Sequence, residues 1–75
     1  MAKEQNYPTQ AERSILRALA QYGTLAKAAA SLYLSRHAVK SSLTRMRTRY
    51  RLVNTPQLMA MAGREGWLDG HIAGN

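Results

Sequence analysis

Hydrophobic residues recur at helical spacing along most of this chain, and no stretch alternates apolar and polar residues as a strand would. The first predicted helix begins at Thr9, because Thr9 and Glu12 form a capping-box pattern. It ends at Gly23, since glycine tolerates the left-handed backbone that closes many helices. Its apolar face is formed by Ile15, Leu16, Leu19 and Tyr22.

Two further helices follow within the next 28 residues. Thr24 can cap a short helix whose apolar positions follow the i, i+3, i+4, i+7 spacing: Leu25, Ala28, Ala29 and Leu32. Tyr33 and Leu34 break that pattern, and Ser35 can cap a longer helix over residues 35–51. The spacing turns one side of this longer helix inward: Val39, Leu43, Met46 and Tyr50.

A fourth helix is predicted with Thr55 as its cap, Pro56 at its first position and Gly66 at its end. We therefore expect an all-α domain, with a core of three helices and a fourth helix after it. The domain should span residues 9–70, with a flexible arm over residues 1–8 and a polar tail over residues 71–75.

The second and third predicted helices have the spacing of a helix-turn-helix. A small residue, Ala29, stands where two such helices would cross, and the β-branched Val39 follows ten positions later. Leu32 and Leu34 are expected to fill the angle between the helices. This geometry would push the helix over residues 35–51 outward, so that it could enter a major groove.

The charge of the chain favours a polyanionic partner. Its net charge is +7 and its pI is 10.6, and no acidic residue lies between residues 13 and 64. Six of the eleven Lys and Arg residues fall within residues 35–51. We therefore predict contacts with double-stranded DNA from Thr24, Lys27, Ser35, Arg36, His37, Lys40, Ser41, Thr44, Arg45, Arg47 and Thr48.

The first turns of a recognition helix usually reach the base edges, which favours Arg36, His37 and Lys40 as base contacts. A lysine there can donate to guanine O6 and N7. Tyr22 could touch phosphate, as could Tyr33, but packing in the core or at its rim is the favoured interpretation for both.

Five segments of the chain carry a resemblance to a known family: Thr9–Glu12, Leu19–Gln21, Leu32–Ser35, Ala38–Leu43 and Asn54–Ala60. Through these segments, the chain from residue 9 to about residue 68 resembles the DNA-binding domain of LuxR/GerE-type transcription regulators. The family usually shows Thr-Val-Lys-x-His-Leu on its recognition helix and glycines where this chain has Tyr33 and Arg51. Lys40 matches the lysine of that motif and directly follows the inward Val39, so the resemblance makes it the first choice for a base contact.

The resemblance implies a sequence-specific transcription regulator, which we expect to be a stand-alone domain from a bacterium or a phage. It also implies a homodimer formed through the fourth helix, which Gly63 and Glu65 would weaken. The candidate dimer residues are Leu58, Met59, Met61, Ala62 and Trp67, although Trp67 fits closure of the core equally well.

Other interpretations stay open. A segment at the start of LysR-type regulators is also similar to residues 23–39, but those proteins continue into a winged hairpin, whereas Pro56 here favours a helix. The basic helix could instead dock on an acidic protein, such as an RNA polymerase subunit or another regulator. Binding of RNA is a weaker option, because no sheet with exposed aromatic residues is predicted.

The sequence offers no support for an enzyme, a cofactor or a metal site. It has no nucleophile–base pair and no glycine-rich phosphate loop, and His37 and His71 are far apart with no cysteine to join them. No apolar run is long enough to span a membrane, and a chain without cysteine suits a reducing cytoplasm. We expect a location in the bacterial cytoplasm or in a phage-infected cell.

Overall fold

The computed structural model describes residues 7–69, and within that range the chain forms four helices and no strand. They are α1 (Gln10–Tyr22), α2 (Leu25–Ser31), α3 (Arg36–Tyr50) and α4 (Thr55–Glu65). The prediction of an all-α, four-helix domain is therefore confirmed. Of the expected arm, only Tyr7 and Pro8 belong to the described range, and Pro8 is buried; the expected tail lies outside that range.

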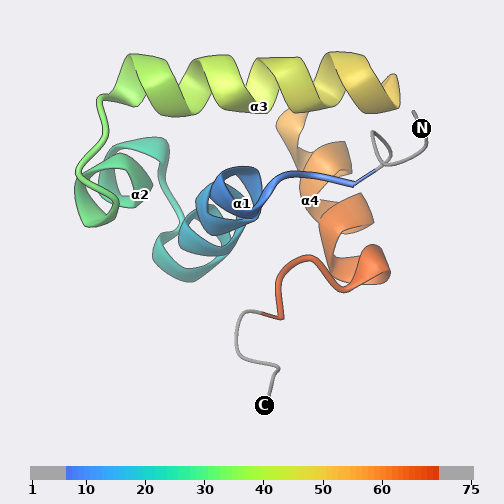
Figure 1. The fold of residues 1–75 in the computed structure, drawn as a ribbon, viewed down its shortest axis with the longest axis horizontal. Coiled ribbons are helices and arrows are strands. Elements are labelled where there is room, and N and C mark those ends of the chain that lie inside the picture. Colours follow the sequence, from blue (N-terminus) through green and yellow to red (C-terminus); the bar gives the residue numbers. More distant parts are fainter. Residues whose placement is uncertain (1–6, 70–75) are drawn as a thin grey trace.

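The helices meet in an arrangement that leaves α3 along one edge of the molecule (Figure 1). The first helix packs against the other three, α2 also packs against the N-terminal side of α3, and α4 packs against α3. Residues 32–35 connect α2 to α3, and a four-residue connection of this kind is typical of a helix-turn-helix. Consequently one long side of α3 has no other helix of the described residues 7–69 against it.

Most helix ends follow the signals in the sequence. Thr9 and Glu12 form the full capping box, in which the Glu12 amide donates to Thr9 Oγ1 at 3.1 Å and the Thr9 amide donates to Glu12 Oε1 at 2.9 Å. Thr24 and Ser35 cap α2 and α3 as expected, and Gly23 closes α1 in the left-handed conformation.

The predicted start of α4 is wrong by one residue. Asn54 is the cap, because its side-chain oxygen accepts a hydrogen bond from the Gln57 amide at 2.9 Å. Thr55 is therefore the first helical residue and Pro56 the second. Both positions lie in the first turn, where the absence of an amide hydrogen on proline costs no intrahelical bond.

The core is built from inward residues that the helical spacing predicted, except that Tyr22 of α1 is 43% exposed and does not belong to it. Val39, Leu43 and Met46 of α3 are buried, as are Ile15 and Leu16 of α1. Trp67 closes the core from beyond α4, with its ring 5.2 Å from the half-buried ring of Tyr50. Of the two interpretations of Trp67, closure of the core and contact in a dimer, the structure therefore supports closure of the core.

Among residues 7–69, two non-glycine residues have a positive φ angle: Tyr33 at 59° and Arg51 at 61°. Both stand where the sequence resemblance placed a glycine. Arg51 still closes α3, since its amide donates to the carbonyls of Arg47 and Thr48. For residues other than glycine this backbone costs about 1–2 kcal/mol.

The expectation that Tyr33 packs at the core or its rim is wrong, because its side chain is 96% exposed. Leu34, which was expected to fill the angle between α2 and α3, is also partly exposed, whereas Leu32 does pack against the core. Ala29, which was expected where α2 and α3 cross, is buried in the core.

Within residues 7–69, no helix is both long and apolar enough to cross a membrane.

Candidate nucleic-acid interface

The outward side of α3 is the candidate interface, and its direction is fixed by the core on the opposite side. Ser35 Oγ accepts a hydrogen bond from the Ala38 amide at 3.0 Å, which sets the start of the helix. Val39 and Met46 are fully buried, so the helix cannot rotate about its axis without exposing them. Lys40, Thr44 and Arg45, which lie between these anchors on the opposite side of the helix, are thereby held toward solvent.

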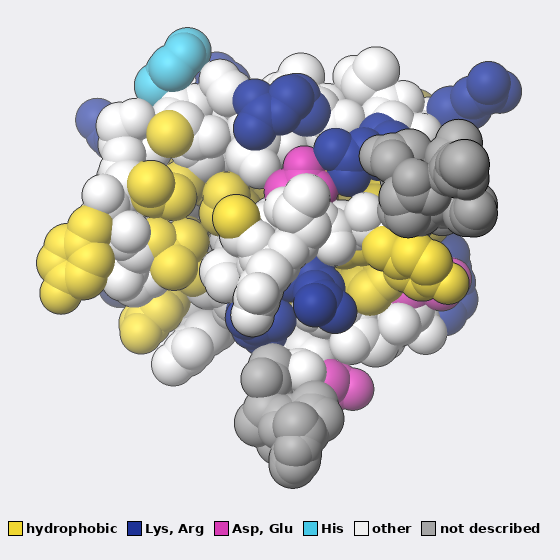
Figure 2. All heavy atoms as spheres, viewed as in Figure 1, with side chains coloured by type: hydrophobic (Ala, Val, Ile, Leu, Met, Phe, Trp, Pro, Cys, Tyr) yellow, Lys and Arg dark blue, Asp and Glu magenta, His cyan; other side chains and the backbone are white. Residues whose placement is uncertain are grey.

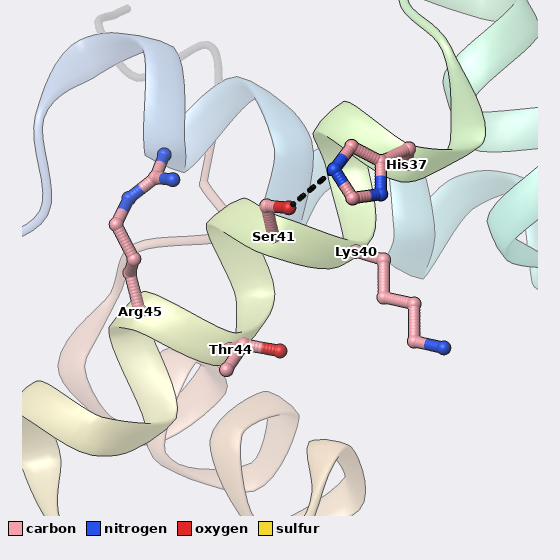
Figure 3. Close-up of a pocket in the computed structure, with 5 residues that line it drawn as sticks. All are labelled: His37, Lys40, Ser41, Thr44 and Arg45. Carbon is pink, nitrogen blue, oxygen red and sulfur yellow. Dashed lines mark hydrogen bonds between the residues drawn. The ribbon is translucent and has the colours of Figure 1, made fainter.

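Five side chains line an open hollow on this surface: His37, Lys40, Ser41, Thr44 and Arg45. Figure 3 shows Lys40 and Arg45 leaving α3 in opposite directions, with His37, Ser41 and Thr44 between them. All except the half-buried Ser41 are exposed. The structure therefore brings these five predicted DNA contacts together on one surface, which has short polar groups in the middle and a cation on either side.

His37 and Ser41 lie one helical turn apart and contact each other through His37 Nε2 and Ser41 Oγ at 3.5 Å. This is at the long limit for a hydrogen bond, so it orients the imidazole ring only loosely. Both groups can donate and accept hydrogen bonds, and the edges of base pairs in a major groove offer complementary donors and acceptors.

Arg47 is less free than the prediction assumed. Its Nη1 donates to the Val53 carbonyl at 3.4 Å and its Nη2 donates to Thr44 Oγ1 at 3.3 Å, while its buried Nε has no partner within residues 7–69. Arg47 thus ties α3 to the connection before α4. It is half-buried, and a phosphate contact would have to compete with these hydrogen bonds.

The other predicted contacts surround this surface. Thr24 and Lys27 are exposed in the first turn of α2, where Thr24 Oγ1 accepts from the Lys27 amide at 3.2 Å. Arg36 and Thr48 are exposed near the two ends of α3. Figure 2 shows Lys and Arg side chains along the edge of the molecule that α3 forms.

The ion pair between Arg49 and Glu12 was missing from the sequence prediction. Arg49 Nη1 and Nη2 donate to Glu12 Oε1 and Oε2, each at 2.8 Å, and Glu12 is buried. These hydrogen bonds hold the pKa of Glu12 below its usual range and raise that of Arg49. The sequence held one indication of this ion pair, because Glu12 is the one acidic residue of α1 and lies in its first turn.

The candidate dimer surface requires a correction. Leu58 and Ala62 are fully buried in the core of their own chain, and Trp67 is nearly so. They cannot offer free surface to a second copy. Met59 and Met61 are half-buried against the same core. Of the five candidate dimer residues, these two alone keep surface that a second copy could contact. The prediction failed because α4 buries most of its apolar face on α1 and α3.

Comparisons of this chain with models of protein families, with curated proteins and with solved structures found no match.

Proposed function

We propose that this protein is a sequence-specific regulator of transcription that binds double-stranded DNA and inserts α3 into the major groove. The observation that carries the proposal is the outward side of α3, where Lys40 and Arg45 flank three short polar side chains on a helix whose register the core fixes. A major groove is wide enough for one helix, and phosphates line both of its rims.

The charge balance supports the same proposal. Six cations lie within residues 35–51, and of these Arg49 is engaged by Glu12. No acidic residue in residues 13–64 offsets the others. Because each neutralised phosphate releases condensed counterions, such a surface would bind DNA with an affinity that falls as salt rises.

The sequence resemblance to LuxR/GerE-type regulators adds to the proposal. The four helices and the turn between α2 and α3 suit such a domain, and residues 52–65 form a loop and a helix where a LysR-type regulator has a winged hairpin. A homodimer is part of the proposal, with the half-buried Met59 and Met61 of α4 as its remaining candidate contacts.

Selection of duplexes from a random pool would test DNA binding directly. We expect enrichment of a defined sequence, bound with an affinity that decreases with salt concentration. Two inverted half-sites in that sequence would reveal a dimer. A chain that docks only on an acidic protein would show no preference among duplexes.

Lys40→Ala tests the assignment of the reading face. Losing one base contact should cost about 1–3 kcal/mol on the selected sequence and relax the preference at one position. The matched control is Arg45→Ala, which should weaken selected and random duplexes by the same factor if Arg45 contacts phosphate. Competition titrations would measure both variants, and equal losses on both duplexes for Lys40→Ala would contradict its role as a base contact.

A further inference from the structure

A second exposed surface lies at the end of the molecule where α1, α2 and the turn after α2 meet. We define it as the turn surface, formed by Tyr22, Leu32, Tyr33 and Leu34. The side chain of Tyr33 is 96% exposed, and Tyr22 and Leu34 are 43% and 42% exposed. Figure 2 shows hydrophobic side chains gathered over α2 and the neighbouring turn, on the left of the view.

Tyr33 contributes little to folding. Its φ angle of 59° is unfavourable for any residue with a side chain, and glycine would adopt it without strain. An exposed ring also gains almost no packing energy to offset that strain. A strained backbone that presents an aromatic side chain to solvent is therefore a candidate for recognition rather than for stability.

The turn surface continues into an open groove between α1 and α2. Tyr22 and Leu32 line that groove together with Ala18 and with polar side chains that include Arg17 and Ser14. Arg17 Nη2 donates to Ser14 Oγ at 3.3 Å, which holds the guanidinium on the α1 side of the groove. The surface thus combines an exposed aromatic ring, an aliphatic floor and a cation.

Within residues 7–69, the charged residues of the groove, of α2 and of the first turn of α3 are all cations. Arg17 lies in the groove, Lys27 is exposed on α2 and Arg36 is exposed at the start of α3. No acidic residue occurs in residues 13–64, and Glu12 is held by its ion pair at the opposite end of α1. A complementary ligand would therefore carry carboxylates beside its apolar side chains.

We propose that the turn surface binds an acidic, amphipathic segment of a partner protein, with an aliphatic or aromatic side chain of that segment packed against Tyr33 and Leu34. Aromatic residues beside arginine are enriched where protein interfaces have their strongest contacts. Protein is favoured over nucleic acid as the ligand because all four residues of the turn surface are large hydrophobic residues and three of them are exposed. None of the four lines the hollow on α3. The proposal does not depend on DNA binding by α3.

Selection of random 16-residue peptides displayed on phage, with the full chain as bait, tests the proposal. We expect the enriched peptides to combine Asp or Glu with Leu, Ile or Phe. Their affinity, measured by fluorescence anisotropy, should fall at least tenfold for Tyr33→Gly and for Leu34→Ser. Tyr33→Gly should melt at or above the temperature of the parent, because it relieves strain and removes no buried contact.

Val53→Ser is the matched control, because Val53 is a 78% exposed apolar residue that lies between α3 and α4 instead of in the turn. It should leave peptide affinity unchanged, and both Tyr33→Gly and Val53→Ser should bind duplex DNA like the parent. Enriched peptides without acidic residues, or with equal affinity for Tyr33→Gly, would overturn the proposal. A loss of duplex affinity in Tyr33→Gly would also overturn it, by assigning the turn surface to DNA.

Discussion

Glu12 shows how one side chain can serve both a helix end and the packing of two helices. Its Oε1 accepts hydrogen bonds from the Thr9 amide and from Arg49 Nη1, and its Oε2 accepts one from Arg49 Nη2. The first contact caps α1 and the other two attach the last turn of α3 to the first turn of α1. Charge-assisted, two-point hydrogen bonds of this kind are stronger and more directional than neutral ones.

Replacing Glu12 with Gln should therefore destabilise the fold by about 1–3 kcal/mol at neutral pH, because it removes the charge while keeping one acceptor for the Thr9 amide. The pKa of Glu12 is lowered in the folded state, chiefly by the hydrogen bonds from Arg49. The stabilisation is thus complete above the unfolded pKa of about 4.3 and is lost as pH falls through the lower folded pKa.

Chemical denaturation across pH would measure this difference between the parent and Glu12→Gln, which should shrink in acid. Glu65→Gln is the control, since Glu65 is exposed at the end of α4 and should change stability little at any pH. Parallel stability curves for the parent and Glu12→Gln would show that the ion pair contributes nothing to folding.

At the scale of single residues, the sequence predicted contacts that depend on neighbours in the chain and missed those that depend on the fold. The capping box of Thr9 and Glu12 could be read from a spacing of three residues. The pairing of Glu12 with Arg49 joins residues 37 positions apart, which no local pattern encodes. Tyr33 was misplaced for a related reason: tyrosine usually packs, and only the folded turn reveals that its side chain is 96% exposed.

At the scale of the helices, periodicity predicted which side of each helix faces the core, and local signals predicted most of their ends. Asn54 was missed because two residues capable of capping stand side by side, and proline is tolerated at either of the next two positions. The apolar residues of α4 were assigned to a dimer, which is wrong for Leu58 and Ala62, since apolar spacing alone cannot say which apolar partner a residue meets.

The rotation of α3 about its axis is the feature on which the candidate interface depends, and Val39→Asp tests it. Val39 is fully buried, so an aspartate there would be an unpaired charge in the core. We expect a loss of about 3–5 kcal/mol, which is comparable to the whole stability of so small a domain. Circular dichroism should show a chain that is largely unfolded at room temperature.

Thr44→Asp is the control for that experiment, because it introduces the same residue into the same helix on the exposed side. It should fold like the parent and weaken DNA binding through repulsion of phosphate. If Val39→Asp melted like the parent, the inward side of α3 and the whole candidate interface would be assigned wrongly.

At the scale of the whole molecule, the charge is distributed unequally between the two ends of the fold. The cations of α2 and α3 have no acidic neighbours in residues 13–64, whereas α4 ends at Glu65 and is followed closely by Asp69. This asymmetry could be predicted from the sequence, because it depends on composition along the chain. The sequence could not predict which cations are free, because Arg47 and Arg49 form their hydrogen bonds only in the folded protein.

The two exposed cations Lys27 and Arg45 should each neutralise one phosphate if the proposed DNA complex forms. Replacing either with Ala should weaken binding to every duplex and lower the slope of log affinity against log salt by about one unit. Arg64→Ala is the control, because Arg64 is equally exposed but belongs to α4, away from the outward side of α3. It should leave the slope unchanged. Titrations of a fixed duplex at several salt concentrations would measure all three variants. If Arg64→Ala lowered the slope as much as Arg45→Ala, the affinity would come from the net charge of +7 and not from a docked α3.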